Sequence, residues 1–147
     1  MIARPALTLS LRFVDRSHRH LVARHQVARW IRAALSAPAE IAVRVLPQAE
    51  ARALNLAYRR RDYATNVLTF DYQKAPQVVA DLALCAPVIE HEARAAGIDL
   101  VAHYAHLVVH GTLHAQGYDH LKPAQARRME NLESAILQRL GFANPYP

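Results

Sequence analysis

Cysteine, long apolar runs and flexible linkers are scarce in this 147-residue chain. Cys85 is the only cysteine, so no disulfide can form within the chain, which suits a reducing compartment. No run approaches the roughly eighteen uncharged apolar residues that a membrane helix needs, and the N-terminus lacks the apolar core of a secretory signal. We therefore expect a cytoplasmic protein without a membrane span.

Lysine is nearly absent as well. Lys and Arg together number 18 against 12 Asp and Glu, a net charge of +6, and every cation except Lys74 and Lys122 is an arginine. A basic surface attracts polyanions, and a guanidinium group can hold a phosphate through two parallel hydrogen bonds. Arginines that only solvate helix surfaces would give the same composition, so the charge indicates nucleic acid without establishing it.

The hydrophobic pattern predicts one α+β domain over residues 1–147. Strand patterns cover residues 7–14, 41–46, 66–72 and 78–85, whereas helical patterns cover a segment capped by Ser17 and running to Leu35, then residues 49–58, 87–97, 99–115 and 123–141. This order indicates a small mixed four-stranded sheet packed with about five helices. Residues 144–147 are expected to form a loosely held tail.

Three histidines carry the strongest chemical signal. His110 and His114 are four residues apart, so on a helix both imidazoles project from one face and can reach one ion. Gly117 then ends the helix, and the chain reversal can bring His120 back as a third ligand. Three protein ligands leave a fourth tetrahedral position for water, as in catalytic sites. Imidazole ligands and metal availability favour one Zn²⁺, with Ni²⁺ as the alternative.

Other residues near these histidines have several interpretations. The histidine spacing is that of the metzincin proteases, but Gly111 stands where those enzymes carry a glutamate base, which argues against a peptidase. About 12 Å of helical rise separates His106 from His114, so His106 cannot share the ion with both predicted helical ligands. We interpret His103 and His106 as packed or hydrogen-bonded side chains; a substrate contact or a ligand-orienting role is the alternative for His106. Asp119 either caps the helix end or orients a ligand.

Three consecutive arginines, Arg59–Arg61, follow the second predicted helix. At least two of them are explained by stabilisation of the negative helix end. One can instead face the metal and offset the charge that develops on a phosphodiester. Asp62 can pair with an arginine, while Thr65 and Asn66 offer hydrogen bonds that fix the loop before the next strand.

These motifs resemble the bacterial YbeY family of endoribonucleases, also described as rRNA maturation factors, over nearly the whole chain. The family pattern H-G-x-L-H-x-x-G-Y-D-H is filled at residues 110–120, L-N-x-x-Y-R-x-x-D-x-x-T-N-V-L-S/T-F at residues 54–70, and M-E-x-x-E at residues 129–133. Two positions depart from the family: Ala64 replaces the usual proline, and Ala80 replaces the usual glycine. Neither is a predicted ligand.

The resemblance implies a metal, usually taken as zinc, on His110, His114 and His120, and a functional arginine at Arg59. It also implies hydrolysis of single-stranded RNA, with roles in small-subunit (16S) rRNA maturation and ribosome quality control. The expected partners are rRNA, the small ribosomal subunit and its proteins; neither DNA nor a membrane is expected. The alternative function is a non-catalytic RNA-binding ribosome assembly factor in which the zinc is structural.

Overall fold

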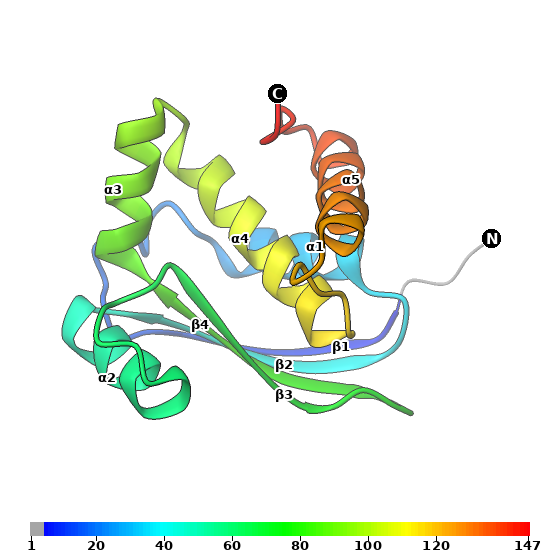
Figure 1. The fold of residues 1–147 in the computed structure, drawn as a ribbon, viewed down its shortest axis with the longest axis horizontal. Helices are drawn as coiled ribbons and strands as arrows, with labels where there is room; N and C mark the ends of the chain where they lie inside the picture. The colour runs from blue at the N-terminus through cyan, green and yellow to red at the C-terminus, as the bar shows by residue number, and fades with distance from the viewer. Residues whose placement is uncertain (1–4) are drawn as a thin grey trace.

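The computed structural model describes residues 5–147, which form a four-stranded sheet packed with five helices (Figure 1). The strands are β1 (Leu7–Phe13), β2 (Ala39–Leu46), β3 (Val67–Gln73) and β4 (Val78–Cys85); the helices are α1 (Arg24–Ala34), α2 (Gln48–Arg59), α3 (Ala86–Ala96), α4 (Leu100–Ala115) and α5 (Pro123–Arg139). The predicted α+β class, with a mixed sheet and about five helices, is confirmed. Within the described residues, no helix has both the length and the apolar character needed to cross a bilayer.

The sheet has the strand order β1-β2-β4-β3. β1 pairs with β2 and β2 with β4 in parallel, whereas β3 and β4 are antiparallel. A parallel pair needs a crossover connection, and the segment containing α1 supplies it between β1 and β2. β4 has a neighbour on both sides, and its sequence is accordingly an almost continuous apolar run.

Successive residues of β4 point to opposite faces of the sheet and so contribute to two apolar clusters. Leu82 and Leu84 join the main core, which also contains Trp30 of α1 and much of α4. Ala83 and Cys85 join a smaller cluster under α2 on the opposite face. Figure 1 shows the resulting layers, with α1, α4 and α5 on one side of the sheet and α2 on the other.

α4 approaches the sheet closely because it carries a glycine at the contact. A Cβ atom at Gly111 would lie 2.9 Å from Leu82 Cδ2 and 3.4 Å from Thr69 Oγ1. The glycine therefore lets the helix backbone pack directly over β4. A glutamate of the metzincin type has no room at this position.

Two expectations about local structure are wrong. α1 begins at Arg24 and not after Ser17, because the backbone nitrogen and Oγ of Ser17 both donate to Asp15 Oδ1 (2.9 and 2.6 Å). The intervening turn is held by buried His18, whose Nδ1 lies 2.6 Å from the hydroxyl of Tyr104 on α4. The second wrong expectation concerns residues 144–147, which are docked against α5 as described below.

Candidate metal centre

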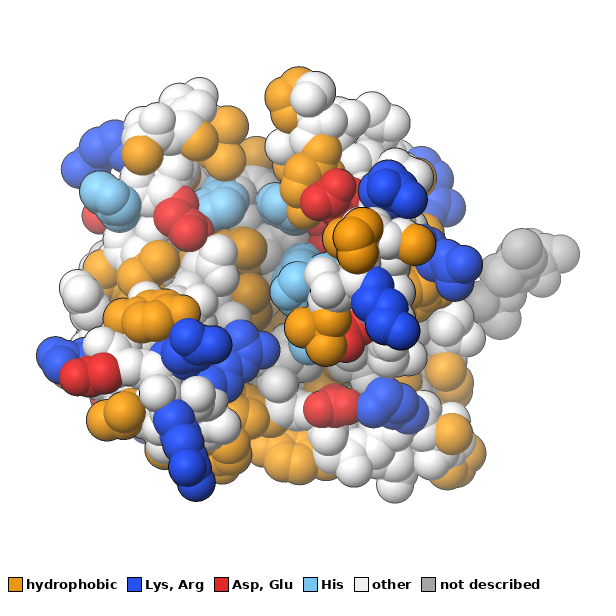
Figure 2. Space-filling model, in the orientation of Figure 1, with side chains coloured by type: hydrophobic (Ala, Val, Ile, Leu, Met, Phe, Trp, Pro, Cys, Tyr) orange, Lys and Arg blue, Asp and Glu red, His pale blue; other side chains and the backbone are white. Residues whose placement is uncertain are grey.

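One face of α4 presents a row of histidines. They recur every three or four positions, a spacing that places helical side chains above one another. The row consists of His103, His106, His110 and His114. Figure 2 shows histidine side chains gathered in a hollow across the middle of the molecule, with Lys and Arg side chains on both sides of it. The hollow therefore combines imidazole groups with a rim that carries Lys and Arg side chains, with Asp and Glu side chains among them.

The turn after α4 brings a further histidine back to this row. Gly117 has a φ of +105°, in the region that favours glycine, and the chain reverses there as the sequence predicts. The ring centroid of His120 lies 5.6 Å from that of His110 and 5.9 Å from that of His114. The centroids of His110 and His114 are 6.4 Å apart. The structure thus places the rings of these three histidines next to one another.

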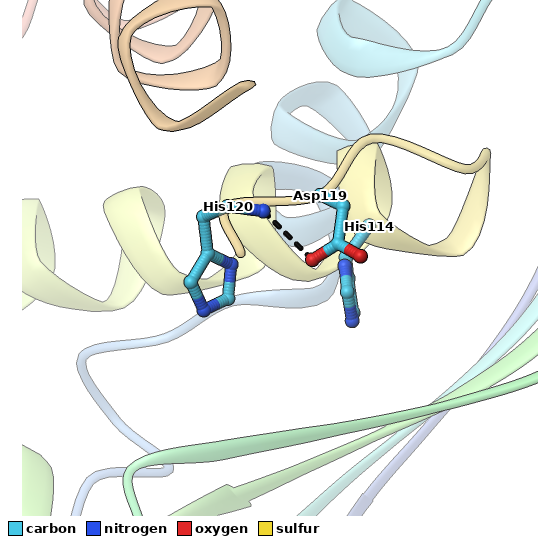
Figure 3. A group of neighbouring side chains, drawn as sticks. All are labelled: His114, Asp119 and His120. Atoms are coloured by element: carbon cyan, nitrogen blue, oxygen red, sulfur yellow. Dashed lines mark hydrogen bonds between the residues drawn. The ribbon is translucent and has the colours of Figure 1, made fainter. Parts of the chain in front are cut away.

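Asp119 lies beside this trio. One of its carboxylate oxygens and one ring nitrogen each of His114 and His120 lie within 4.8 Å of one another (Figure 3). Its Oδ1 accepts a hydrogen bond from the backbone N–H of His120 (2.7 Å). The carboxylate therefore fixes the loop that carries His120. Asp119, and not His110, completes the group of atoms close enough to hold one metal ion.

The two helical histidines each have one ring nitrogen occupied by an acceptor. Nδ1 of His114 donates to the backbone carbonyl of Tyr118 (2.8 Å), and Nδ1 of His110 donates to the carboxylate of Glu133. An imidazole that donates through Nδ1 keeps the lone pair on Nε2. Both rings are therefore held in the tautomer that leaves Nε2 free to bind a cation.

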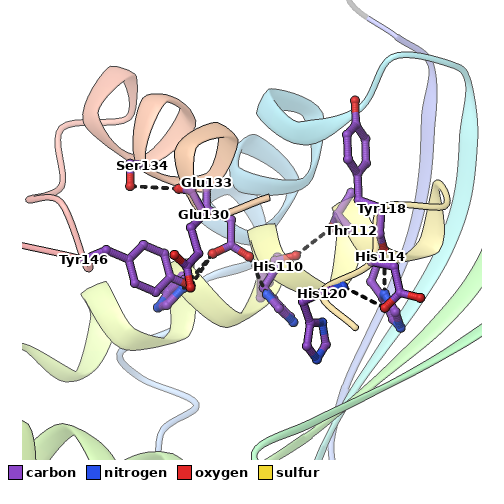
Figure 4. Close-up of polar contacts among 12 residues, drawn as sticks. His110, Thr112, His114, Tyr118, His120, Glu130, Glu133, Ser134 and Tyr146 are labelled. Carbon is purple, nitrogen blue, oxygen red and sulfur yellow. Dashed lines mark hydrogen bonds and ion pairs between the residues drawn. The ribbon is translucent and has the colours of Figure 1, made fainter. Parts of the chain in front are cut away.

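Glu133 of α5 is completely buried and serves two histidines at once (Figure 4). One oxygen accepts from Nδ1 of His110 and the other from Nε2 of His106 (3.1 Å). Burial raises the pKa of the Glu133 carboxyl, but the hydrogen bonds from the two histidines outweigh it and lower the pKa to about 2. Glu133 is therefore an ionised carboxylate behind the predicted ligand.

Sequence reasoning gave no role to this glutamate. A signal was present, however, because Glu133 occupies the buried face of α5 that also carries Met129, Ile136 and Leu137. An acid at a position of an apolar stripe needs a buried partner. The histidine row supplies that partner, because His106 and His110 both donate hydrogen bonds to the Glu133 carboxylate.

The C-terminal segment covers this carboxylate. The hydroxyl of Tyr146 donates to Glu133 Oε2 and also lies 3.0 Å from Nε2 of His106. Burial and the contact with Glu133 raise the pKa of this hydroxyl, so it remains a donor. Asn144 holds the segment in place, because its Oδ1 accepts from Ser134 Oγ and from the backbone nitrogen of Tyr146 (both 2.8 Å).

A small cavity of about 170 Å³ opens between the histidines and the loop before β3. Among the three consecutive arginines, Arg59 lines this cavity, whereas Arg60 is the left-handed cap of α2 with a φ of 57°. Asp62 pairs with Arg52 through two hydrogen bonds (2.7 and 3.0 Å) and so holds an arginine outside the triplet. The cavity lining consists of Arg59, Thr65, Asn66, Val67, Thr69, His110, His114 and His120.

Asn66 is fixed at the edge of this cavity as the sequence predicts. Its Oδ1 accepts from the backbone nitrogen of Val67 (2.6 Å), and its Nδ2 donates to Glu92 Oε1 (3.1 Å). The same Glu92 oxygen accepts from Nε2 of His103 (2.9 Å). His103 is therefore a hydrogen-bonded side chain and lies outside the ligand group.

Comparison with known proteins places these residues in a family. The profile described as "Endoribonuclease YbeY" matches residues 8–141. The chain belongs to the YbeY endoribonuclease family. Two proteins named Endoribonuclease YbeY are 63% identical over 98% of this chain and 97% of their own length (Methylibium petroleiphilum), and 58% identical over 95% of both (Acidovorax sp.). The solution structure of TM1509 from Thermotoga maritima shares the fold, with a TM-score of 0.56 at 16% identity over 95% of this chain and 99% of that one.

The motif residues of this chain offer a set of nitrogen ligands that fits one metal ion of intermediate hardness, such as Zn²⁺. Three imidazoles are the ligands that zinc and neighbouring metals accept. The ring centroids of the three histidines lie 5.6 to 6.4 Å apart, so the three rings border one site.

Proposed function

We propose that this chain is a metal-dependent endoribonuclease that hydrolyses phosphodiester bonds in single-stranded RNA. The observation that carries the proposal is the cavity in which His110, His114 and His120 face Arg59. Ligands for a cation and a guanidinium for an anion are two elements that metal-assisted phosphodiester hydrolysis uses. The family membership and the net charge of +6 support an RNA substrate over a peptide.

We infer one zinc ion on His110, His114 and His120, with nickel as the alternative. By distance alone, Asp119 competes with His110, because it forms the tightest group with His114 and His120. His110 is the stronger third ligand because the ionised Glu133 behind its Nδ1 increases the basicity of its Nε2. Oδ1 of Asp119 already accepts from the loop backbone.

Bound zinc supplies a Lewis acid and lowers the pKa of a coordinated water to near neutrality. The remaining chemistry falls to residues of the chain. Arg59 pairs with a non-bridging phosphate oxygen and offsets the negative charge that grows as water attacks phosphorus. One P–O ester bond breaks in this step, and the leaving ribose oxygen takes up the proton that the water loses. Glu133 and the Tyr118 carbonyl hold the imidazoles in the productive tautomer. No separate carboxylate base is needed in this scheme.

We further propose that the substrate is rRNA of the small subunit (16S). The chain would cleave it in the cytoplasm during maturation and quality control of the ribosome, and would bind proteins of the small subunit there. This proposal rests on the family resemblance and on the Lys and Arg side chains on the rim of the hollow. It predicts cleavage of a 16S precursor at a discrete position by purified protein, and unprocessed precursor in cells that carry an inactive variant. Uniform degradation of every RNA offered would contradict the rRNA role but not the nuclease activity.

The test of the nuclease proposal combines elemental analysis with an RNA cleavage assay. His114→Ala should lose both the metal and the cleavage, whereas His91→Ala, an exposed histidine of α3, should lose neither. Arg59→Ala should keep the metal and lose most of kcat, whereas Arg60→Ala should retain activity. If the mutant His114→Ala cuts RNA at the wild-type rate, the mechanism is wrong. Metal and stoichiometric RNA binding without turnover would instead identify an assembly factor with structural zinc.

A further inference from the structure

A second hollow of about 590 Å³ adjoins the metal centre. It shares Arg59, His114 and His120 with the smaller cavity, so the two form one continuous depression. Its remaining walls come from the loop after α2 and from the loop after α4. Those walls are Arg61, Tyr63, Asp119 and Leu121.

Two of these walls are apolar side chains left in solvent. Leu121 is 82% exposed and Tyr63 is 57% exposed, so neither contributes appreciably to the folded core. A scattered exposed apolar residue needs no explanation, but here two of them line the same depression beside two guanidinium groups. Aromatic faces interleaved with arginines are the surface on which single-stranded nucleic acid stacks its bases and lays its phosphates.

We propose that this hollow is a nucleotide subsite, in which the base next to the scissile phosphate stacks on Tyr63 against Leu121. Arg61 then pairs with the following phosphate while Arg59 holds the scissile one. A base within a duplex has no free face, so the subsite selects unpaired RNA by geometry and tolerates any base. The inference rests on the proposed nuclease function. It adds Tyr63 as a residue that binds the RNA substrate.

The test is Tyr63→Ala in the metal-loaded protein, with Tyr72→Ala as the control. Tyr72 is 63% exposed on β3, its hydroxyl donates to Asp81 (3.0 Å), and it lies outside the hollow. With an oligonucleotide of known cleavage site, Tyr63→Ala should raise KM about 5- to 30-fold with little change in kcat, the lower range for loss of one stacked base. Tyr72→Ala should not change KM.

An abasic substrate separates stacking from other effects. Removing the base on one side of the cleaved bond should weaken the wild type by a similar factor, and should not weaken Tyr63→Ala further. If the wild type cleaves RNA but Tyr63→Ala has an unchanged KM, the subsite is refuted and the nuclease function stands. If the wild type does not cleave RNA at all, the proposed function itself fails.

A different observation, the docked C-terminal segment, carries a second inference. One oxygen of Glu133 accepts a hydrogen bond from His110, and the other accepts from His106 and Tyr146. His106 and Tyr146 therefore set the orientation of the carboxylate from the side that faces away from His110. We infer that Tyr146 is a positioning residue for the metal centre, acting through Glu133. Its hydroxyl fixes the carboxylate, and the carboxylate fixes the ring plane and basicity of His110.

Tyr146→Phe tests this inference, because phenylalanine keeps the ring against His106 and removes only the hydroxyl. Zn²⁺ affinity of the metal-free protein, measured against a competing chelator, should fall about tenfold, the lower range for residues that hold a ligand. The visible absorption of the Co²⁺-loaded protein should shift. Tyr72→Phe, which removes a hydroxyl remote from the histidines, should leave both unchanged.

The positioning role of Tyr146 and the metal centre itself are refuted by different results. Unchanged Zn²⁺ affinity and an unchanged Co²⁺ spectrum in Tyr146→Phe would refute the positioning role while the metal centre stands. Absence of stoichiometric Zn²⁺ and Co²⁺ binding by the wild type would refute the metal centre itself. Asn144→Ala, which releases the segment from Ser134, should reproduce the loss of affinity seen in Tyr146→Phe.

Discussion

Replacing Glu133 with glutamine removes one charge from the interior and leaves the shape of the side chain unchanged. The wild-type carboxylate has no exposed surface and accepts hydrogen bonds from His106 and His110. Glutamine offers one acceptor oxygen and an amide group that donates, so Glu133→Gln cannot accept a hydrogen bond at each of its two terminal atoms as the carboxylate does. The variant therefore tests whether the ionised carboxylate stabilises the protein.

The magnitude follows from the pKa of this carboxyl. Burial raises the pKa, the histidine hydrogen bonds lower it more strongly, and the result is a fall from 4.5 to about 2. A depressed pKa in the folded state adds stability that is fully present above the unfolded value and is lost as the pH falls through the folded value. The shift corresponds to about 3 kcal/mol. This contribution should be present above about pH 5 and disappear towards pH 2.

Urea unfolding of the metal-free protein, followed by circular dichroism in the presence of chelator, measures this contribution. At pH 7 Glu133→Gln should be less stable than the wild type by about 3 kcal/mol, and the two curves should converge as the pH falls from 5 towards 2. Half-buried Glu130, three residues earlier on α5, provides the matched control Glu130→Gln. Parallel stability curves for wild type and Glu133→Gln across this pH range would refute the reasoning.

Three further substitutions test the packing around the site. Gly111→Ala should lower the free energy of unfolding by about 1–2 kcal/mol, because the clash with Leu82 outweighs the gain in helix propensity; a higher thermal midpoint would contradict this. Trp30→Ala removes a side chain that is 1% exposed and should cost about 3–5 kcal/mol in urea unfolding, whereas a loss below 1 kcal/mol would show that the core refills. Arg52→Ala breaks a solvent-exposed pair with Asp62 and should leave the thermal midpoint unchanged within error; a clear drop would mean that the pair orders the loop.

Local signals made most of the elements predictable. Residues 78–85 were predicted as a strand and form β4 with the same bounds, because an apolar β-rich run between a proline connection and Pro87 has few alternatives. The helix predicted over residues 99–115 matches α4 because Asp99 caps it by accepting from the Ala102 nitrogen (3.2 Å), and Gly117 reverses the chain after it.

Contacts between distant residues account for what the sequence did not predict. Ser17 is a good helix cap in isolation, but Asp15 takes its hydrogen bonds and the following turn is anchored on Tyr104 far along the chain. The same holds at the site. Histidine spacing within one helix is visible in the sequence, whereas Glu133 lies on another helix and reaches His110 through packing that no local pattern encodes.

The glycine contact between α4 and the sheet links the positions of the predicted ligands to the packing of the protein interior. His110 is the residue next to Gly111, so the ring that Glu133 orients is carried by the backbone that rests on Leu82. A substitution that enlarges the side chains beneath this helix would move His110 and His114 together, because both are on α4, whereas His120 is carried by the following loop. If the proposed metal site is correct, the packing beneath α4 is therefore constrained by the arrangement of the three histidines above it, and a stabilising substitution there that displaces the helix would lower activity.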